Sequence, residues 1–270
     1  MNQTLRGPDT AAINQRYDEL FYARRMSEFS GRWGNFGYWT ESTRTQAEAC
    51  ENQMEKLLSH IPVREGRILD VACGMGATSR HLARYWGPGQ ITGINISEKQ
   101  LATCREMVPG ATFRIMDAAH MEFEDASFDN MVCVEAAFHF DTRESFFREA
   151  LRVLKPGGTL ALSDVLLTRE GARTRLVCTE KNHLDTPAEY ADLFRRCGFE
   201  AVEVVDVTEE CWNRHYRHLV LYAHEMLLKG EIELTEMQQY LAATYKRVPD
   251  IMNYLLAAGR KPKATSPGAR

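Results

Sequence analysis

Short apolar runs alternate with amphipathic, more polar stretches along the chain from about residue 61 onward. Seven runs have the length and apolar content of buried strands: 67–73, 90–96, 111–117, 128–135, 159–165, 199–207 and 251–262. Helix-type patterns cover 78–86, 97–107, 141–154 and 186–198, with Ser97 and Thr186 as N-caps. This alternation predicts an α/β fold, a doubly wound, parallel, Rossmann-like sheet of seven strands with helices on both faces.

Two stretches depart from this alternation. Residues 1–60 are helical in pattern and rich in aromatic residues, and we expect them to form an N-terminal cap. Residues 209–248 are expected to form two helices inserted in the core domain 61–262, the first capped at Thr208 and ending at Gly230, the second starting at Thr235. Such an insertion would act as a lid over the carboxyl ends of the strands, where open α/β sheets bind ligands. Residues 263–270 are expected to be a disordered tail.

The overall composition narrows the class of partner. Lys and Arg number 33 and Asp and Glu 37, a net charge of −4, and no basic run precedes the tail. This balance argues against nucleic acid or an anionic membrane as the main partner. Seven scattered cysteines without a C-x-x-C spacing favour buried thiols in a reducing compartment. Because the N-terminus has no apolar targeting segment, we expect a cytoplasmic protein with a small-molecule partner; a homo-oligomer stays open.

The first predicted strand ends in a glycine-rich turn, within the sequence ILDVACGMGATSR at 68–80. A dinucleotide-binding turn has the spacing G-x-G-x-x-G, and an acidic residue ends the second strand. Here the small residues are Ala72, Gly74 and Gly76, and the second strand ends at Asn95. No Gly-Lys-Ser or Gly-Lys-Thr follows. The turn therefore matches neither a dinucleotide site nor a P-loop.

The turn resembles the D-x-G-x-G-x-G motif of class I S-adenosylmethionine-dependent methyltransferases, with Asp70 as the acid and Ala72 in the first glycine position. Three further segments resemble later motifs of that family in the same order: RIMDAAHMEF at 114–123, FEDASFDNMVCVEAAFHF at 123–140 and LRVLKPGGTLALSD at 151–164. The nearest likeness is to small-molecule enzymes of natural-product pathways, including the sugar O-methyltransferase of rebeccamycin biosynthesis. The resemblance runs from about residue 12 to 262 and implies S-adenosyl-L-methionine as the cofactor.

The resemblance also implies which residues bind the cofactor. Asp117 and the amide of Ala118 would contact the adenine, and the ribose side would lie near Asn95, Ile96 and Gln100. Gln100 has an alternative role in the capping box of Ser97, and Asp70 would hold either the ammonium of the cofactor or the amides of the turn. The other expected members of the site are Tyr38, Ala72, Cys73, Gly74 and Glu135. Tyr38, with Tyr17 and Trp39, resembles aromatics that close over the methionine end, with packing of the cap as the alternative.

His139 is the candidate general base, because a histidine pKa of about 6.5 leaves the imidazole mostly neutral at pH 7. Related sugar O-methyltransferases carry a His-His pair here, and Phe138 takes the place of the first histidine. Asp164 matches an aspartate that supports catalysis in those relatives; a turn cap is the alternative. We expect metal-independent O-methylation of a small, hydroxylated, natural-product-like molecule. The alternatives are C- or N-methylation of an aromatic or alkaloid-like molecule, and a protein of this fold that catalyses a cyclisation or only binds the cofactor.

Overall fold

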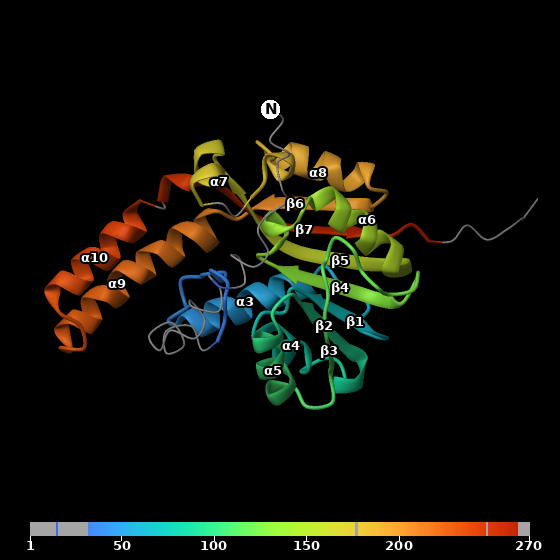
Figure 1. Ribbon diagram of the computed structural model, residues 1–270, viewed down its shortest axis with the longest axis horizontal. Helices are drawn as coiled ribbons and strands as arrows, with labels where there is room; N and C mark the ends of the chain where they lie inside the picture. Colours follow the sequence, from blue (N-terminus) through green and yellow to red (C-terminus); the bar gives the residue numbers. More distant parts are fainter. Residues whose placement is uncertain (1–14, 16–31, 176–177, 247, 264–270) are drawn as a thin grey trace, which may run out of the picture.

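A seven-stranded sheet in the order β3-β2-β1-β4-β5-β7-β6 forms the centre of the computed structural model, which describes residues 15, 32–175, 178–246 and 248–263 (Figure 1). The strands are β1 (Ile68–Val71), β2 (Ile91–Asn95), β3 (Thr112–Ile115), β4 (Phe128–Val134), β5 (Leu154–Leu167), β6 (Glu200–Asp206) and β7 (Ile251–Arg260). Each strand overlaps the apolar run that predicts it. The seven-stranded α/β fold is therefore confirmed.

The helices of the described chain are α3 (Gln46–Leu58), α4 (Ala77–Leu82), α5 (Glu98–Met107), α6 (Arg143–Val153), α7 (Arg169–Arg175), α8 (Pro187–Arg196), α9 (Arg214–Leu228) and α10 (Leu234–Tyr245). Among them, α5, α6 and α8 begin directly after the threonine or serine residues that cap them. The side chains of Ser97, Thr142 and Thr186 accept from backbone amides at the starts of α5, α6 and α8. Short 3₁₀ turns lie at Pro88–Gln90, Ala137–His139, Glu180–Asn182 and Val248–Asp250, and a π-helical turn at Glu209–Asn213.

Helices cover both faces of the sheet (Figure 1). Met131 and Cys133 of β4 belong to the apolar core that contains α6 and α8, whereas Val132 belongs to the core with α3 and α4. Successive residues of a strand point to opposite faces, so the continuous apolar run of β4 serves two cores. α5 adds a smaller cluster with β3, through Leu101 and Phe113.

β7 runs antiparallel to both of its neighbours, whereas the other strand pairs of this sheet are parallel. The prediction of a parallel sheet is therefore corrected at this strand. The connection between β6 and β7 explains why β7 runs in the opposite direction. β6 ends at the carboxyl edge of the sheet, and the insertion that contains α9 and α10 returns the chain to the same edge. A strand that starts from this edge must run the opposite way.

α9 and α10 form a hairpin that projects from the body of the molecule (Figure 1). Both predicted helices are present, but their predicted caps are wrong. The Thr208 hydroxyl bonds to Asp206, and its helical backbone leads into the π-helical turn before α9. Glu233 caps α10 in a box with Glu236, in place of Thr235. A separate apolar cluster joins the two helices through Ala223, Met237 and Leu241.

Part of the expected N-terminal cap lies within the described chain. α3 packs against the sheet through Cys50, Met54 and Leu57, and the segment 33–39 precedes it. The expected tail lies outside the described residues from position 264 onward. None of the described helices is long and apolar enough to cross a membrane.

Candidate functional site

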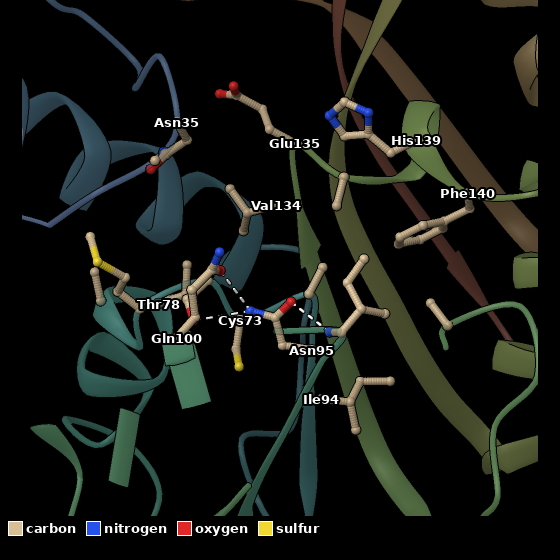
Figure 2. Close-up of a pocket in the computed structure, with 18 of the residues that line it drawn as sticks. Asn35, Cys73, Thr78, Ile94, Asn95, Gln100, Val134, Glu135, His139 and Phe140 are labelled. Atoms are coloured by element: carbon tan, nitrogen blue, oxygen red, sulfur yellow. Dashed lines mark hydrogen bonds between the residues drawn. The ribbon is translucent and has the colours of Figure 1, made fainter. Parts of the chain in front are cut away.

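A cavity of about 370 Å³ lies at the carboxyl ends of β1, β2, β3 and β4 (Figure 2). The strand order reverses between β1 and β4, and open α/β sheets bind ligands at such a point. Of the predicted site residues, all line this cavity except Tyr38, Asp70 and Asp164. The lining consists of residues 32–35, 72–75, 77, 78, 94–96, 100, 116–118, 134–136 and 139–141.

The turn after β1 forms one wall of the cavity. Ala72 and Gly74 have φ values of 56° and 54°, in the left-handed region. A Cβ on Gly74 would meet no described atom within 4 Å, whereas a Cβ on Gly76 would lie 3.1 Å from the Cα of Cys104 in α5. Gly74 therefore keeps space open beside the cavity, and Gly76 permits α4 and α5 to pack closely.

Asp70 lies in β1, directly before the turn, and is buried. Its Oδ2 accepts from the hydroxyls of Thr78 (2.6 Å) and Ser79 (2.5 Å). Burial raises the pKa of Asp70 to about 6, although these two hydrogen bonds lower it. Among the described residues, its Oδ1 has no hydrogen-bond partner. Asp70 thus ties β1 to the start of α4.

Side-chain amides organise the loop after β2 (Figure 2). Asn95 Nδ2 donates to Gln100 Oε1 (2.9 Å) and to the Gly74 carbonyl (3.2 Å), and Asn95 Oδ1 accepts from the Ile96 amide (2.7 Å). The backbone amide of Gln100 donates to Ser97 at the helix start, while its side chain lines the cavity. Gln100 therefore takes part in the cap and also lines the cavity.

Asp117 and Ala118 line the cavity just after β3. The Asp117 side chain is 55% exposed. Its Oδ1 accepts from the Ala119 amide (2.8 Å), and its Oδ2 lies 3.4 Å from Nδ1 of His120. A carboxylate can accept about four hydrogen bonds, so Asp117 keeps acceptor capacity for a ligand.

Glu135 follows β4 with a φ of 48°, a strained conformation for a residue other than glycine. Its Oε1 accepts from the Phe36 amide (2.6 Å) and from the Tyr254 hydroxyl (2.5 Å). Burial raises the pKa of Glu135 to about 8, against the lowering effect of these hydrogen bonds. The carboxyl group is therefore largely protonated near neutral pH.

His139 lines the cavity at the same end as Glu135, at the close of the turn Ala137–His139 (Figure 2). Its ring packs on Phe138, with ring centroids 3.9 Å apart. Two buried side chains brace the turn. Asp164 Oδ1 accepts from the Phe138 amide (3.1 Å), and Asn182 Nδ2 donates to the carbonyls of residues 137, 138 and 140 at 3.0–3.2 Å.

Asp164 does not line the cavity, because other protein groups surround its carboxylate. Oδ2 accepts from Arg143 Nε (2.7 Å) and from the Tyr190 hydroxyl (3.0 Å), and Oδ1 also accepts from the Val165 amide (2.8 Å). Arg143 and Asp164 are both buried. Burial alone would lower the pKa of Arg143, but the neighbouring Asp164 raises it, so the guanidinium stays charged.

The segment 32–35 forms a wall of the cavity that sequence analysis missed. Trp33 and Asn35 line the cavity, and Asn35 Nδ2 donates to Gln53 Oε1 of α3 (2.6 Å). The only indication of this wall in the sequence was Asn35, the polar residue at the start of the aromatic stretch 35–39. Asn182, which braces the His139 turn from a distant loop, had no signal in the sequence.

The predicted cap aromatics have other contacts. Tyr38 lies outside the lining, with Lys56 Nζ 5.0 Å from its ring centroid. Trp39 is buried and packs against His218 of α9, with ring centroids 4.3 Å apart. Tyr17 lies outside the described residues.

The charge of the lining favours a cationic ligand. The carboxylates of Asp117 and Asp141 line the cavity beside the largely protonated Glu135, and Arg32 is the only Lys or Arg among the described lining residues. An acidic cleft attracts positive charge and opposes a polyphosphate.

Known proteins share both the sequence and the fold. The family model for a methyltransferase domain matches residues 69–162. The chain is 33% identical over 247 residues to methyltransferase GfsG of Streptomyces halstedii, covering 84% of this chain and 86% of the relative. It is 29% identical to 27-O-demethylrifamycin SV methyltransferase of Amycolatopsis mediterranei, over 94% and 98% of the two chains.

Among solved structures, the cyclase SpnF has a TM-score of 0.72 at 22% identity, covering 96% of this chain and 98% of that one. At this level of identity the likeness shows a shared fold.

Proposed function

Since the chain belongs to the class I S-adenosylmethionine-dependent methyltransferases of natural-product type, we propose that it methylates a hydroxyl group of a small acceptor, with His139 as the general base. The observation that carries the proposal is the place of His139 in the cavity. The part lined by Asn95, Gln100 and Asp117 is called here the nucleoside end. The part lined by Asn35, Glu135 and His139 is called the methyl-transfer end.

The cavity suits S-adenosyl-L-methionine in shape and charge. Open space beside Gly74 permits close approach of a ligand to the backbone. Asp117 has acceptor capacity for the adenine amino group, and the amides of Asn95 and Gln100 suit ribose hydroxyls. Glu135 supplies an acidic group for the cationic part. The cofactor would supply a methyl group on a sulfonium, from which a neutral thioether departs without activation by a metal ion. The proposal therefore includes no metal ion.

The tasks left to the protein are to align the hydroxyl, to exclude water and to accept a proton. Alignment of two reactants contributes about 7 kcal/mol or more in favourable cases. His139 accepts the hydroxyl proton on its imidazole as the acceptor oxygen becomes a nucleophile. The contact with Phe138 restricts the orientation of the imidazole ring.

We assign Asp164 the part of a positioning residue. Its carboxylate is shared among Arg143, Tyr190 and backbone amides, and it does not line the cavity. Through the Phe138 amide it holds the turn that carries His139. This arrangement supports an effect of Asp164 on the rate without contact with the acceptor.

The hairpin α9–α10 and the N-terminal segment are proposed to shape the acceptor pocket. The hairpin leaves the sheet at the carboxyl edge, the edge that bears the cavity. The base of the hairpin packs on the N-terminal segment, with Phe36 centred 4.9 Å from both Trp212 and His215. No described residue of 209–248 lines the cavity itself. We therefore expect the hairpin to affect the acceptor more than the cofactor.

The test is incubation with methyl-labelled cofactor and a set of hydroxylated polyketides, glycosides and phenols. Mass spectrometry detects the labelled product, and NMR locates the methyl group. The proposal expects the label on oxygen and its loss in His139→Ala. A label on carbon or nitrogen would replace O-methylation by the alternative chemistry. An unlabelled rearranged product would indicate a cyclase, and cofactor binding without any product a binding protein.

A further inference from the structure

Glu135 lines the cavity and forms no ion pair with a described Lys, Arg or His, although Arg32 lines the same cavity. The Phe36 amide and the Tyr254 hydroxyl both donate to Oε1 of this carboxyl group, and the side chain of Gln53 also lowers its pKa by hydrogen bonding. The Tyr254 hydroxyl in turn accepts from Gln53 Nε2. The N-terminal segment and β7 thus hold Oε1, and no hydrogen bond from a described residue reaches Oε2 of this cavity-lining side chain.

The described titratable groups that interact most strongly with Glu135 oppose its ionisation or are uncharged near neutral pH. Tyr254 faces it from β7, Cys50 from α3 and Cys211 from the π-helical turn, and burial keeps all three in the neutral form by raising their pKa values. Asp164 of β5 adds negative charge, although Arg143 pairs with it. Arg32 and His139 line the same cavity. Burial raises the pKa of Glu135 to about 8, so a cationic ligand would change its protonation state.

We propose that Glu135 makes the site selective for the charge of the cofactor: it is protonated in the free enzyme, ionises against the sulfonium of S-adenosylmethionine, and is protonated again beside the neutral thioether of the product. On cofactor binding, the O–H bond of the carboxyl group breaks and the proton passes to solvent; after methyl transfer, the carboxylate takes a proton back from solvent. The assignment rests on the proposed function, since an acceptor hydroxyl at His139 requires the reacting methyl group, and hence the sulfonium, at the methyl-transfer end.

This arrangement favours substrate over product by charge alone. The ionised carboxylate attracts the sulfonium but gains nothing from the thioether, which lacks its positive charge. Well below the pKa, affinity for S-adenosylmethionine should rise about tenfold per pH unit, because one proton must leave for each cofactor bound. Above about pH 8 this dependence should level off, since Glu135 is then ionised before binding. Affinity for S-adenosylhomocysteine should lack this component.

Calorimetry in buffers of different ionisation enthalpy counts the protons released on binding. Three ligands are compared at pH 7: S-adenosylmethionine, S-adenosylhomocysteine, and sinefungin, whose amine carries the positive charge without a transferable methyl group. We expect nearly one proton released through Glu135 with each of the two cationic ligands and almost none with S-adenosylhomocysteine. Glu135→Gln preserves the acceptor oxygen but cannot ionise. The number of protons that this variant releases on binding comes from other groups, including the amino groups of the ligands, and is subtracted from the number for the wild type.

Two variants separate charge from structure. Glu135→Gln should weaken S-adenosylmethionine at pH 8 by about tenfold to a hundredfold and leave S-adenosylhomocysteine within a few-fold. Tyr254→Phe removes a hydrogen bond that lowers the pKa of Glu135, so the pH at which affinity levels off should rise. If Glu135 had only a structural role, Tyr254→Phe would not change the pH dependence of cofactor affinity.

Equal proton release with both S-adenosylmethionine and S-adenosylhomocysteine would overturn the proposal, because it would place Glu135 against the ammonium that both ligands share. No release with either would overturn it as well. If Glu135→Gln fails to fold, the difference between the two ligands in the wild type still decides. Label transfer to an acceptor oxygen without selective proton release would refute this inference and leave the proposed function standing.

Discussion

The two ends of the cavity are assembled in different ways. At the nucleoside end, Asn95 bonds to Gln100, five positions away, and to Gly74, 21 positions away. At the methyl-transfer end, Glu135 is held by residues 99 and 119 positions distant, Phe36 and Tyr254. Consecutive strand–turn–helix units are sufficient to build the first end. The second end exists only when the N-terminal segment, β4 and β7 have folded together. Substitutions at the two ends should therefore have separable effects.

The largest effect is expected at the methyl-transfer end. His139→Ala should lower the turnover rate about 100- to 10,000-fold, because the hydroxyl loses its proton acceptor. Cofactor affinity by calorimetry should stay within a few-fold of the wild type. His224→Ala, which alters a histidine of α9 outside the cavity lining, is the matched control and should retain the cofactor affinity and fold of the wild type. Near-normal turnover in a folded His139→Ala would remove His139 as the base.

Asp164, which holds the turn that carries His139, should affect the stability of the protein as well as the turnover rate. Asp164→Ala leaves the buried Arg143 without its partner, and breaking a buried ion pair costs about 3–5 kcal/mol. Chemical denaturation should show this loss in the free energy of unfolding. Asp164→Ala combined with Arg143→Met removes both charges and should recover part of the stability but not the rate. Full stability in the single variant would contradict the role of the ion pair.

At the nucleoside end, a substitution should reduce the affinity for the cofactor and leave the fold unchanged. Asp117→Ala should weaken S-adenosylmethionine and S-adenosylhomocysteine to the same degree, since both contain the adenine group. A hydrogen bond to a charged group contributes about 1.5–3 kcal/mol, and the Ala119 amide shares this carboxylate. Dissociation constants from calorimetry test the prediction. Unchanged constants for both ligands would mean that Asp117 does not bind the adenine.

The smallest effects should separate the two glycines of the turn. Gly76→Ala brings a Cβ within 3.1 Å of the Cα of Cys104, and overpacking of this kind costs about 1–3 kcal/mol of stability. Gly74→Ala finds open space in the protein and should cost only about 1 kcal/mol for its backbone conformation. Its methyl group would instead occupy space for the cofactor. Thermal unfolding and cofactor titration should therefore rank the two variants in opposite order.

Much of the architecture could be predicted because it depends on local patterns. The apolar runs of β1, β2 and β4 are buried strands, and the side chains of Ser97, Thr142 and Thr186 cap the helices that follow them. The caps of the hairpin could not be predicted in this way. Thr208 continues into a π-helical turn whose Cys211 and Trp212 pack in the main core. Burial of these two side chains outweighed the local preference for a threonine cap.

The order of apolar and polar residues determined by itself the strand–helix alternation, the glycine-rich turn and thus the cofactor class, because each depends on residues within one strand–turn–helix unit. Tertiary structure alone decided the rest of the site. It reversed β7, enclosed Asp164 with Arg143, and brought Asn35 and Glu135 together in the lining of one cavity. It also left Glu135 without an ion-pair partner among the described residues, held instead by hydrogen bonds from the distant Phe36 and Tyr254. Periodicity and local propensity do not encode which distant side chains meet, and the charge state of a buried group depends on those neighbours.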